Sequence, residues 1–372
     1  MKIKRMIIII VIIIIIISLT PAYVGRFIYW NIADINDYKK FPKVEIQNGT
    51  EKFHFYKNHV NFQFEIPQEF ISDKEYNNFE TYLRKTETLV YLVIKNDTII
   101  YEQYFDDYNE STLHTSFSVT KSFISALLGI AIGEGAIKDI DQPVTDYYKD
   151  LKDPGFSKIK IKDLLTMRSG IKFNESYINP FGTVAKFYYG RNLTKYVRNL
   201  KIESPPDRAY NYAAANTQLL SFIIEKATHQ KISDYLQEKI WKSIGMEHNA
   251  QWNMDSKKHN NIKAFCCLTA TARDFAKFGR LYLNNGNWNG KQIIPEKWIR
   301  DTRTITNDSR DSQNYPYTYQ WRSTINDAIF AKGILGQYLY IDYRNDMIFL
   351  RLGKGGGEID WPEFAHQLSE QL

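Results

Sequence analysis

Two segments of the chain carry apolar patterns that are typical of β-strands. Residues 88–105 hold two β-branched and aromatic runs around an Asn-Asp pair, which predicts a β-hairpin. In residues 337–343, Tyr338 and Tyr340 alternate with Leu339 and Ile341, and a polar turn separates this segment from the apolar run 347–352. We therefore expect a second hairpin near the end of the chain.

Other segments repeat apolar residues with the period of a helix. Residues 123–132 carry no charge, which predicts a helix buried on every side. Residues 217–229 and 271–286 show apolar residues at helical spacing. Residues 74–85 and 362–371 are also expected to be helical.

Strands at both ends of the chain with helices between them predict an α+β fold. We expect an antiparallel sheet flanked by helices, built from residues of about 61–135 and 306–372. A mostly helical lobe of about 136–305 lies beside it. A ligand cleft is expected between the two lobes.

The N-terminal segment differs from the rest of the chain. No residue from 6 to 25 is charged, and three basic residues precede this run. A helix of this length spans about 30 Å, the hydrocarbon thickness of a bilayer. We therefore predict a cytoplasmic tail, a single-pass signal-anchor, a connector and an exported domain on the periplasmic or extracellular side, with the bounds 1–5, 6–25, 26–60 and 61–372.

Phe27, Tyr29 and Trp30 follow this segment and are expected to lie in the membrane interface. The alternative is a signal peptide with Thr20 and Ala22 as the small residues before the cut. That alternative predicts a secreted protein.

The formal net charge of +6 arises mainly at the N-terminus, because residues 1–26 hold four basic and no acidic residues. The remainder carries only +2 and has no basic cluster, so we expect no nucleic-acid partner. Cys266 and Cys267 are adjacent and cannot close a long loop. We interpret them as small buried residues rather than as part of a disulfide framework.

Candidate chemistry begins at the mouth of the predicted buried helix, where Ser118 precedes Lys121 by three residues. Residues three apart lie on one face of a helix, so the lysine can reach the serine hydroxyl. A lysine in apolar surroundings gives up its proton more readily and can then activate a serine. The alternative is a capping serine beside a lysine that extends into solvent.

Tyr212 stands in a loop before the helix expected at 217–229. A tyrosine near a lysine ionises more easily and can act as a general base. The chain contains neither H-E-x-x-H nor G-x-S-x-G, so a zinc site and the nucleophile elbow of α/β-hydrolases are not expected. We expect no metal and no organic cofactor.

Several stretches between about residues 60 and 360 resemble the serine hydrolases of the β-lactamase and penicillin-binding-protein superfamily, on the class C side. The similarity is greatest to 6-aminohexanoate-dimer hydrolases and related esterases. The motifs that carry it are SFSVTKSFISALLGIAIGEG, IKDLLTMRSGI, ESPP, YAAANTQLL, TARDFAKFGRLYLNNGNWNGKQIIPEKWI and GILGQYLYID.

The resemblance implies a β-lactamase/DD-peptidase-like fold and a role for individual residues. Ser118 would be the acylated nucleophile, Lys121 its proton partner and Tyr212 the general base and acid, with Tyr210 as the competing assignment. The backbone N–H groups of Ser118 and Ile334 would form the oxyanion hole. Possible substrate-binding residues are Asn216, Lys332, Gly333 and Gly336.

The chain departs from the family pattern at two motifs. Ala214 stands where relatives carry Asn or Ser, and the third motif reads Lys332-Gly333-Ile334 without its threonine. The missing hydroxyl argues against efficient β-lactam turnover. We therefore expect an ester or amide hydrolase acting on a small-molecule or peptide-like substrate. The alternatives are a penicillin-binding enzyme or β-lactamase, and a catalytically weak protein that binds cell-wall peptide or another acyl ligand.

Overall fold

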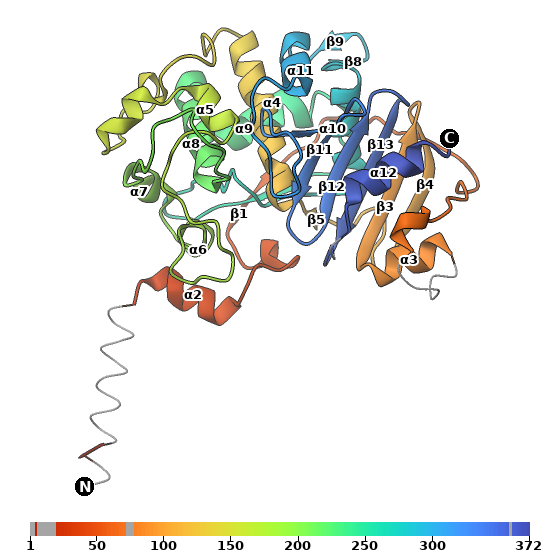
Figure 1. Ribbon diagram of the computed structural model, residues 1–372, viewed down its shortest axis with the longest axis horizontal. Helices are drawn as coiled ribbons and strands as arrows, with labels where there is room; N and C mark the ends of the chain where they lie inside the picture. The colour runs from red at the N-terminus through yellow and green to blue at the C-terminus, as the bar shows by residue number, and fades with distance from the viewer. Residues whose placement is uncertain (1–3, 6–19, 72–77, 357–358) are drawn as a thin grey trace.

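A seven-stranded sheet forms one side of the molecule in the computed structural model, which describes residues 4–5, 20–71, 78–356 and 359–372 (Figure 1). The strand order is β10-β11-β12-β13-β3-β4-β2, and neighbours are antiparallel except that β2 runs parallel to β4. The strands are β2 (Tyr56–Lys57), β3 (Thr88–Lys95), β4 (Thr98–Tyr104), β10 (Arg322–Ser323), β11 (Ala328–Gly333), β12 (Gln337–Asp342) and β13 (Met347–Gly353).

Both predicted hairpins are confirmed. Asn96 and Asp97 connect β3 to β4 with φ values of 48° and 59°, the left-handed conformation that a two-residue hairpin turn requires. Strands β12 and β13 form the second hairpin. The two hairpins are neighbours in the sheet because β13 pairs with β3, so segments from both ends of the chain lie side by side.

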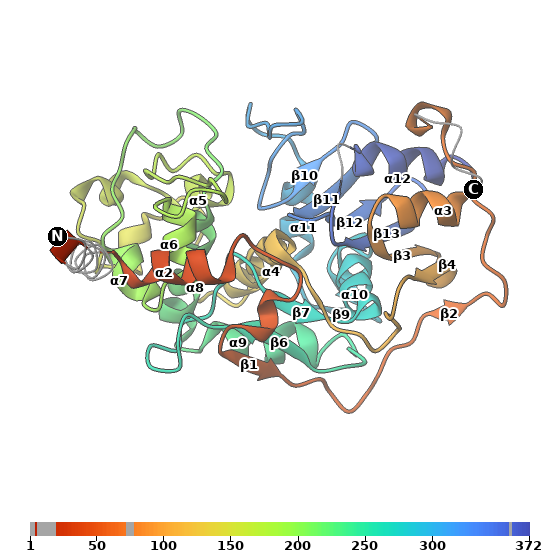
Figure 2. The ribbon, with the colours of Figure 1, turned by 90° about the horizontal axis from the view of Figure 1, so that it is seen from below.

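Helices cover both faces of this sheet (Figure 2). On one face lie α3 (Phe79–Lys85) and α12 (Trp361–Ser369), whose Tyr82 and Phe364 rings stack with their centroids 5.2 Å apart. The other face carries α10 (Ala272–Leu283), which approaches so closely that a Cβ on Gly279 would lie 3.0 Å from Leu339 and Ile348. Helix α10 therefore packs on the sheet, although its residues fall within the range expected for the helical lobe.

The buried helix expected at 123–132 is α4 (Thr120–Gly133), between the sheet lobe and the helical lobe (Figure 1). Phe123 stacks on Phe278 of α10 at 3.7 Å between centroids, and α4 also packs against α8. The other helices of this side are α5 (Ile161–Leu165), α6 (Thr183–Tyr189), α7 (Leu193–Arg198), α8 (Ala214–Thr228) and α9 (Ile232–Leu236), with α11 (Glu296–Arg303) nearer the sheet.

A second, four-stranded sheet was not expected from the sequence. Its order is β1-β6-β7-β5, with all neighbours antiparallel. The pattern of apolar residues did not predict this sheet, because each of its strands is at most four residues long and a strand period cannot be recognised over so few residues. The strands are β1 (Lys43–Ile46), β5 (His114–Thr115), β6 (Ala250–Asn253) and β7 (Leu268–Ala270), and a separate two-stranded ribbon is formed by β8 (Asn287–Trp288) and β9 (Lys291–Gln292).

Most of the predicted signal-anchor, residues 6–19, lies outside the described residues. Within the described parts of the chain, no helix is long and apolar enough to cross a bilayer. The last residues of the uncharged segment 6–25 belong to α2 (Ala22–Trp30), which buries Val24 and Phe27 against the domain beside α6. Residues 26–60, expected as a connector, thus include part of α2 as well as β1, which pairs with β6.

Candidate active site

The Ser118 hydroxyl projects from a tight turn that enters α4. The turn is a 3₁₀ segment, Phe117–Val119, and Phe117 has a φ of 44°, a conformation rarely found for a large side chain. Ser116 stabilises the turn, because its Oγ donates to the Leu268 carbonyl at 2.8 Å and lies 2.7 Å from the Thr120 hydroxyl. The residues on both sides of Ser118 are buried, whereas Ser118 itself is only half-buried and lines a cleft.

Lys121 lies one turn into α4 and points back to the serine. Its Nζ donates to Ser118 Oγ at 2.9 Å and to the carbonyl of Phe265 at 2.7 Å. The residue is only 2% exposed, so the alternative in which this lysine extends into solvent is wrong. The close pairing of an amine and a hydroxyl in a sheltered position is the arrangement that nucleophilic catalysis by serine requires.

Tyr212 reaches the same point from the loop that precedes α8. The Lys121 Nζ lies 5.0 Å from the centroid of the Tyr212 ring. Tyr210 also lines the cleft, and both tyrosine rings pack on Tyr317, with centroids 5.4 Å away for Tyr210 and 6.1 Å away for Tyr212. Burial raises the pKa of Tyr210. The contact of its ring with Lys121 distinguishes Tyr212 as the tyrosine beside the serine-lysine pair.

The end of β11 forms the opposite wall of the cleft. A Cβ on Gly333 would lie 2.5 Å from the Ser116 carbonyl oxygen, so only glycine lets the strand approach the turn that carries Ser118 so closely. Lys332 and Ile334, on either side, line the cleft with Ser118. Burial and the nearby Arg322 guanidinium lower the pKa of Lys332.

The cleft has a volume of ≈ 330 Å³. Its wall contains charged residues that the sequence did not single out. Arg322 is buried and forms an ion pair with Asp311, while Glu175 and Tyr177 lie on the side of the helical lobe. None of these four belongs to a motif, because loops and a short edge strand bring them together only in the folded chain.

Two of the predicted substrate-binding residues lie outside the cleft lining. Asn216 is fully buried, where it accepts a hydrogen bond from Ser169 Oγ at 2.6 Å and donates to Met167 Sδ. The carbonyl of Gly336 accepts from Arg351 at 2.6 Å, and a Cβ there would lie 1.9 Å from that guanidinium. In this structure both residues form hydrogen bonds within the protein, away from the cleft lining.

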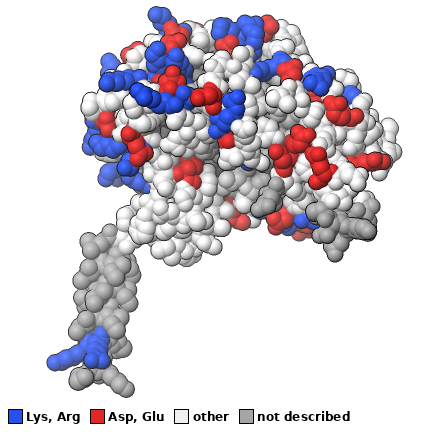
Figure 3. Space-filling model, in the orientation of Figure 1, with Lys and Arg blue, Asp and Glu red and all other residues white. Residues whose placement is uncertain are grey.

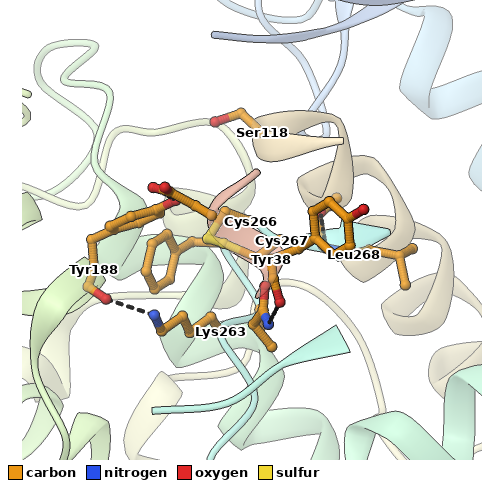
Figure 4. Close-up of a disulfide and its surroundings, with 12 residues drawn as sticks. Tyr38, Ser118, Tyr188, Lys263, Cys266, Cys267 and Leu268 are labelled. Atoms are coloured by element: carbon orange, nitrogen blue, oxygen red, sulfur yellow. Dashed lines mark hydrogen bonds between the residues drawn. A yellow bond between two sulfur atoms is a disulfide. The ribbon is translucent and has the colours of Figure 1, made fainter. Parts of the chain in front are cut away.

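Cys266 and Cys267 are joined by a disulfide, which corrects their interpretation as separate small residues (Figure 4). Both residues are buried, and Cys267 has a φ of 73°. The bridge closes no long loop, so it constrains the local backbone rather than the reach of the unfolded chain. That backbone matters to the site because the preceding carbonyl, of Phe265, accepts the hydrogen bond from Lys121.

The antiparallel sheet, the helical lobe and a serine-lysine pair at the start of the buried helix between them define a β-lactamase and penicillin-binding-protein type of domain. The β-lactamase family model matches residues 77–360, and the chain belongs to this family. It is a hydrolase related to 6-aminohexanoate-dimer hydrolase.

The 6-aminohexanoate-dimer hydrolase of Paenarthrobacter ureafaciens is 26% identical over 310 residues, covering 77% of this chain and 76% of that protein. A solved structure, "Putative 6-aminohexanoate-dimer hydrolase from Bacillus anthracis", is 25% identical, with a TM-score of 0.75 and 89% coverage of each chain. The penicillin binding protein from Bacillus halodurans is 14% identical with a TM-score of 0.63, covering 79% of this chain and 99% of that one, and is alike in fold.

Proposed function

We propose that the protein is a serine hydrolase that cleaves an ester or amide through an acyl intermediate on Ser118. The observation that carries this proposal is the 2.9 Å hydrogen bond between Lys121 Nζ and Ser118 Oγ, at a cleft where the lysine is almost fully buried. Tyr212 completes the constellation because its ring faces the same ammonium group.

In the first half-reaction, Ser118 Oγ attacks the substrate carbonyl carbon, and its proton passes to Lys121 directly or through Tyr212. The backbone N–H groups of Ser118 and Ile334 hold the resulting oxyanion. One such donor typically contributes about 3 kcal/mol of transition-state stabilisation. The bond to the leaving group then breaks, and the leaving group receives a proton from Tyr212.

In the second half-reaction, Tyr212 takes a proton from water, and the hydroxide attacks the acyl carbon. The bond to Ser118 breaks, and its Oγ recovers a proton from Lys121 or Tyr212. Atoms and charges balance without a metal or cofactor, since water supplies both the hydroxyl of the acid product and the proton that the leaving group carried away.

The charges around the cleft support a small-molecule or peptide-like substrate with polar ends. Lys332 and Arg322 line one wall, while Glu175 lines the cleft from the helical lobe. The name of the Paenarthrobacter relative specifies a dimer of the amino acid 6-aminohexanoate as its substrate. We infer that this protein also accepts short linear amides or esters.

We further propose that the domain is exported and attached to the membrane by residues 6–25, the uncharged run that precedes it. Release as a secreted protein after cleavage of that segment is the alternative.

The test of the catalytic proposal is labelling with a fluorophosphonate probe, read by intact mass. The wild-type protein should gain one probe, and the Ser118→Ala variant should gain none. Ser312→Ala is a matched control, because Ser312 lines the same cleft and should leave labelling unchanged. Persistent labelling of Ser118→Ala would remove this residue from the proposed role.

The substrate class is tested by hydrolysis of p-nitrophenyl esters of increasing acyl length beside short linear amides. Turnover that is lost in Ser118→Ala and reduced in Tyr212→Phe supports the proposed hydrolase. Ligand binding without turnover, unaffected by Tyr212→Phe, would instead favour a binding protein, which Ala214 in the second motif first suggested.

A penicillin-binding activity is the second candidate, because Lys332 occupies the cleft as the third-motif lysine would. A fluorescent penicillin that labels Ser118 stably would favour it. Hydrolysis of nitrocefin would instead indicate β-lactamase activity.

A further inference from the structure

A pocket of ≈ 570 Å³, apart from the catalytic cleft, lies beside α2 at the lower edge of the helical lobe (Figure 1). None of the described residues that line it also lines the catalytic cleft. Arg26 and Trp30 reach the pocket from one side of α2, because residues four apart share a helix face. The Trp30 ring packs on Phe41 and Tyr189, with centroids 5.2 Å and 6.2 Å away, so aromatic rings form one wall.

The lining of this pocket carries an excess of positive charge. Its five cationic residues are Arg26, Lys40, Arg191, Lys257 and Lys258. Lys40 forms an ion pair with Asp37 at 2.6 Å, whereas the other four have no ion-pair partner within the described parts of the chain. The carboxylate in the lining, Asp255, is buried and accepts the backbone N–H groups of Leu193 at 2.8 Å and Asn261 at 3.1 Å. The pocket therefore offers cations to an anionic ligand.

The surroundings of the pocket indicate which anion it fits. Guanidinium and ammonium groups bind phosphate oxygens through strong, charge-assisted hydrogen bonds. The outer side of the same helix is apolar, since Ile28 and Tyr29 are 70% and 83% exposed. Arg26 directly follows the uncharged segment 6–25. A phospholipid combines a phosphate with apolar chains, so it matches both the cations and the exposed apolar side chains beside them.

We propose that this pocket binds the phosphate of an anionic phospholipid headgroup. The inference rests on the proposed membrane attachment through residues 6–25, which brings α2 to the bilayer surface. Ile28 and Tyr29 then lie in the membrane interface, and the cations beside them contact the headgroup. A headgroup held in this way fixes α2, and the domain packed on it, against the membrane, in addition to the attachment by the N-terminal segment.

The test is native mass spectrometry of the full chain in a neutral detergent, titrated with either phosphatidylglycerol or phosphatidylcholine. The wild-type protein should retain phosphatidylglycerol in preference to phosphatidylcholine, because only the first lipid carries a net negative charge. In the triple variant Arg191→Gln, Lys257→Gln, Lys258→Gln, the affinity for phosphatidylglycerol should fall by about tenfold or more. These three residues are exposed, so the variant should melt at the temperature of the wild type.

The matched control removes the same charge from another part of the surface. Lys291, Lys297 and Arg300 are exposed on β9 and α11, which lie at the opposite edge of the molecule from α2 (Figure 1). Their triple change to glutamine should leave the preference for phosphatidylglycerol unchanged. An equal loss of affinity in both triple variants would overturn the inference, because net charge alone would then explain the binding.

Glycerol phosphate, the soluble part of the same headgroup, distinguishes a lipid site from a site for free phosphates. It should compete weakly with phosphatidylglycerol, because it lacks the apolar chains. Competition as strong as that of the lipid itself would overturn the assignment of a lipid. Equal retention of the two lipids by the wild type would do the same.

The proposed attachment is read separately, by flotation of the full chain with vesicles of pure phosphatidylcholine. The triple variant at the pocket should float there as well as the wild type, since residues 6–25 are unchanged. Absence of flotation in the wild type would overturn the attachment and, with it, the location assigned to the pocket at the bilayer. Retained flotation without a preference for phosphatidylglycerol would overturn the headgroup site alone.

Discussion

At the scale of single residues, burial determines the charge state of a histidine that lies just before the turn carrying Ser118. His114 lies in β5, four residues before Ser118, and is 5% exposed. Its ring stacks on Tyr108 at 4.9 Å between centroids, and its Nε2 has no hydrogen-bond partner among the described residues. Burial lowers the pKa of His114 from 6.5 to about 3, so it is neutral in the folded protein at neutral pH.

We predict that His114 lowers the free energy of unfolding of the protein at acidic pH. The folded state has the lower pKa, so the unfolded chain binds a proton first as pH falls below about 6.5. Stability should then decline by up to about 1.4 kcal/mol per pH unit until the pH nears 3. Urea unfolding at pH 7, 6, 5 and 4 should give a flatter profile for His114→Phe than for the wild type.

The phenylalanine keeps the stacking on Tyr108 but cannot bind a proton. His59→Phe is the control, because His59 is exposed and should leave the slope unchanged. Equal slopes for wild type and His114→Phe would show that His114 does not contribute to acid sensitivity.

At the scale of elements, the segment 263–268 connects the helical lobe to Lys121. The Phe265 carbonyl accepts from Lys121, and the Cys266 carbonyl accepts from the Trp252 indole at 2.9 Å. The Leu268 N–H donates to the Thr120 hydroxyl at 3.2 Å. The disulfide thus lies within a segment that contacts α4 on both sides of the bridge.

We predict that opening the disulfide slows acylation more than it destabilises the fold. A double variant, Cys266→Ser with Cys267→Ser, should label Ser118 about tenfold more slowly, equivalent to about 1.4 kcal/mol in the barrier. The physical reason is that the Phe265 carbonyl is held less firmly against Lys121. Labelling rates and melting temperatures of the two proteins provide the comparison.

Intact mass supplies an independent check on the bridge itself. Wild-type protein unfolded without reductant should take up no iodoacetamide, and after reduction it should take up two molecules. Alkylation before reduction would contradict the bridge. An unchanged labelling rate in the double variant would restrict the disulfide to a structural role.

At the scale of the whole molecule, α2 joins the N-terminal segment directly to the domain. Phe27 packs on Tyr189 at 5.3 Å and Trp30 on Phe41 at 5.2 Å between centroids, so these two rings contact protein rather than standing free as an interfacial belt. Arg26 donates to the Tyr189 carbonyl at 2.5 Å. The other side of α2 is exposed and apolar, at Ile28 and Tyr29, and Figure 3 shows few charges around this part of the surface.

We predict that truncation within α2 damages the domain, whereas truncation before it does not. A chain beginning at residue 31 should melt roughly 5 °C or more below the full chain, because it loses the buried Val24 and Phe27 side chains. A chain beginning at residue 21 should melt close to the full chain. Differential scanning fluorimetry in one detergent distinguishes the two, and equal melting of both fragments would contradict the packing of α2.

The same two chain lengths test the proposed membrane attachment. The full chain should float with phospholipid vesicles through a density gradient, and most of this flotation should be lost when the chain begins at residue 21. Recovery of a released protein whose N-terminus lies near residue 21 would favour the cleaved signal peptide instead.

Local sequence was sufficient for the features that depend on neighbours along the chain. Both hairpins, the buried α4 and the helices α8, α10 and α12 follow from periods of apolar residues and from turn chemistry. The proximity of Ser118 and Lys121 also follows locally, because three residues of helical backbone bring the two side chains to one face.

Only the tertiary structure decided what surrounds that pair. The four-stranded sheet joins strands up to about two hundred residues apart, and Glu175, Asp311 and Arg322 reach the cleft from separate loops and an edge strand. It also placed Asn216 inside the helical lobe and joined the two cysteines. A period along the chain records which face of an element is apolar, but not which distant element covers that face, so these partners arise only when the whole chain packs.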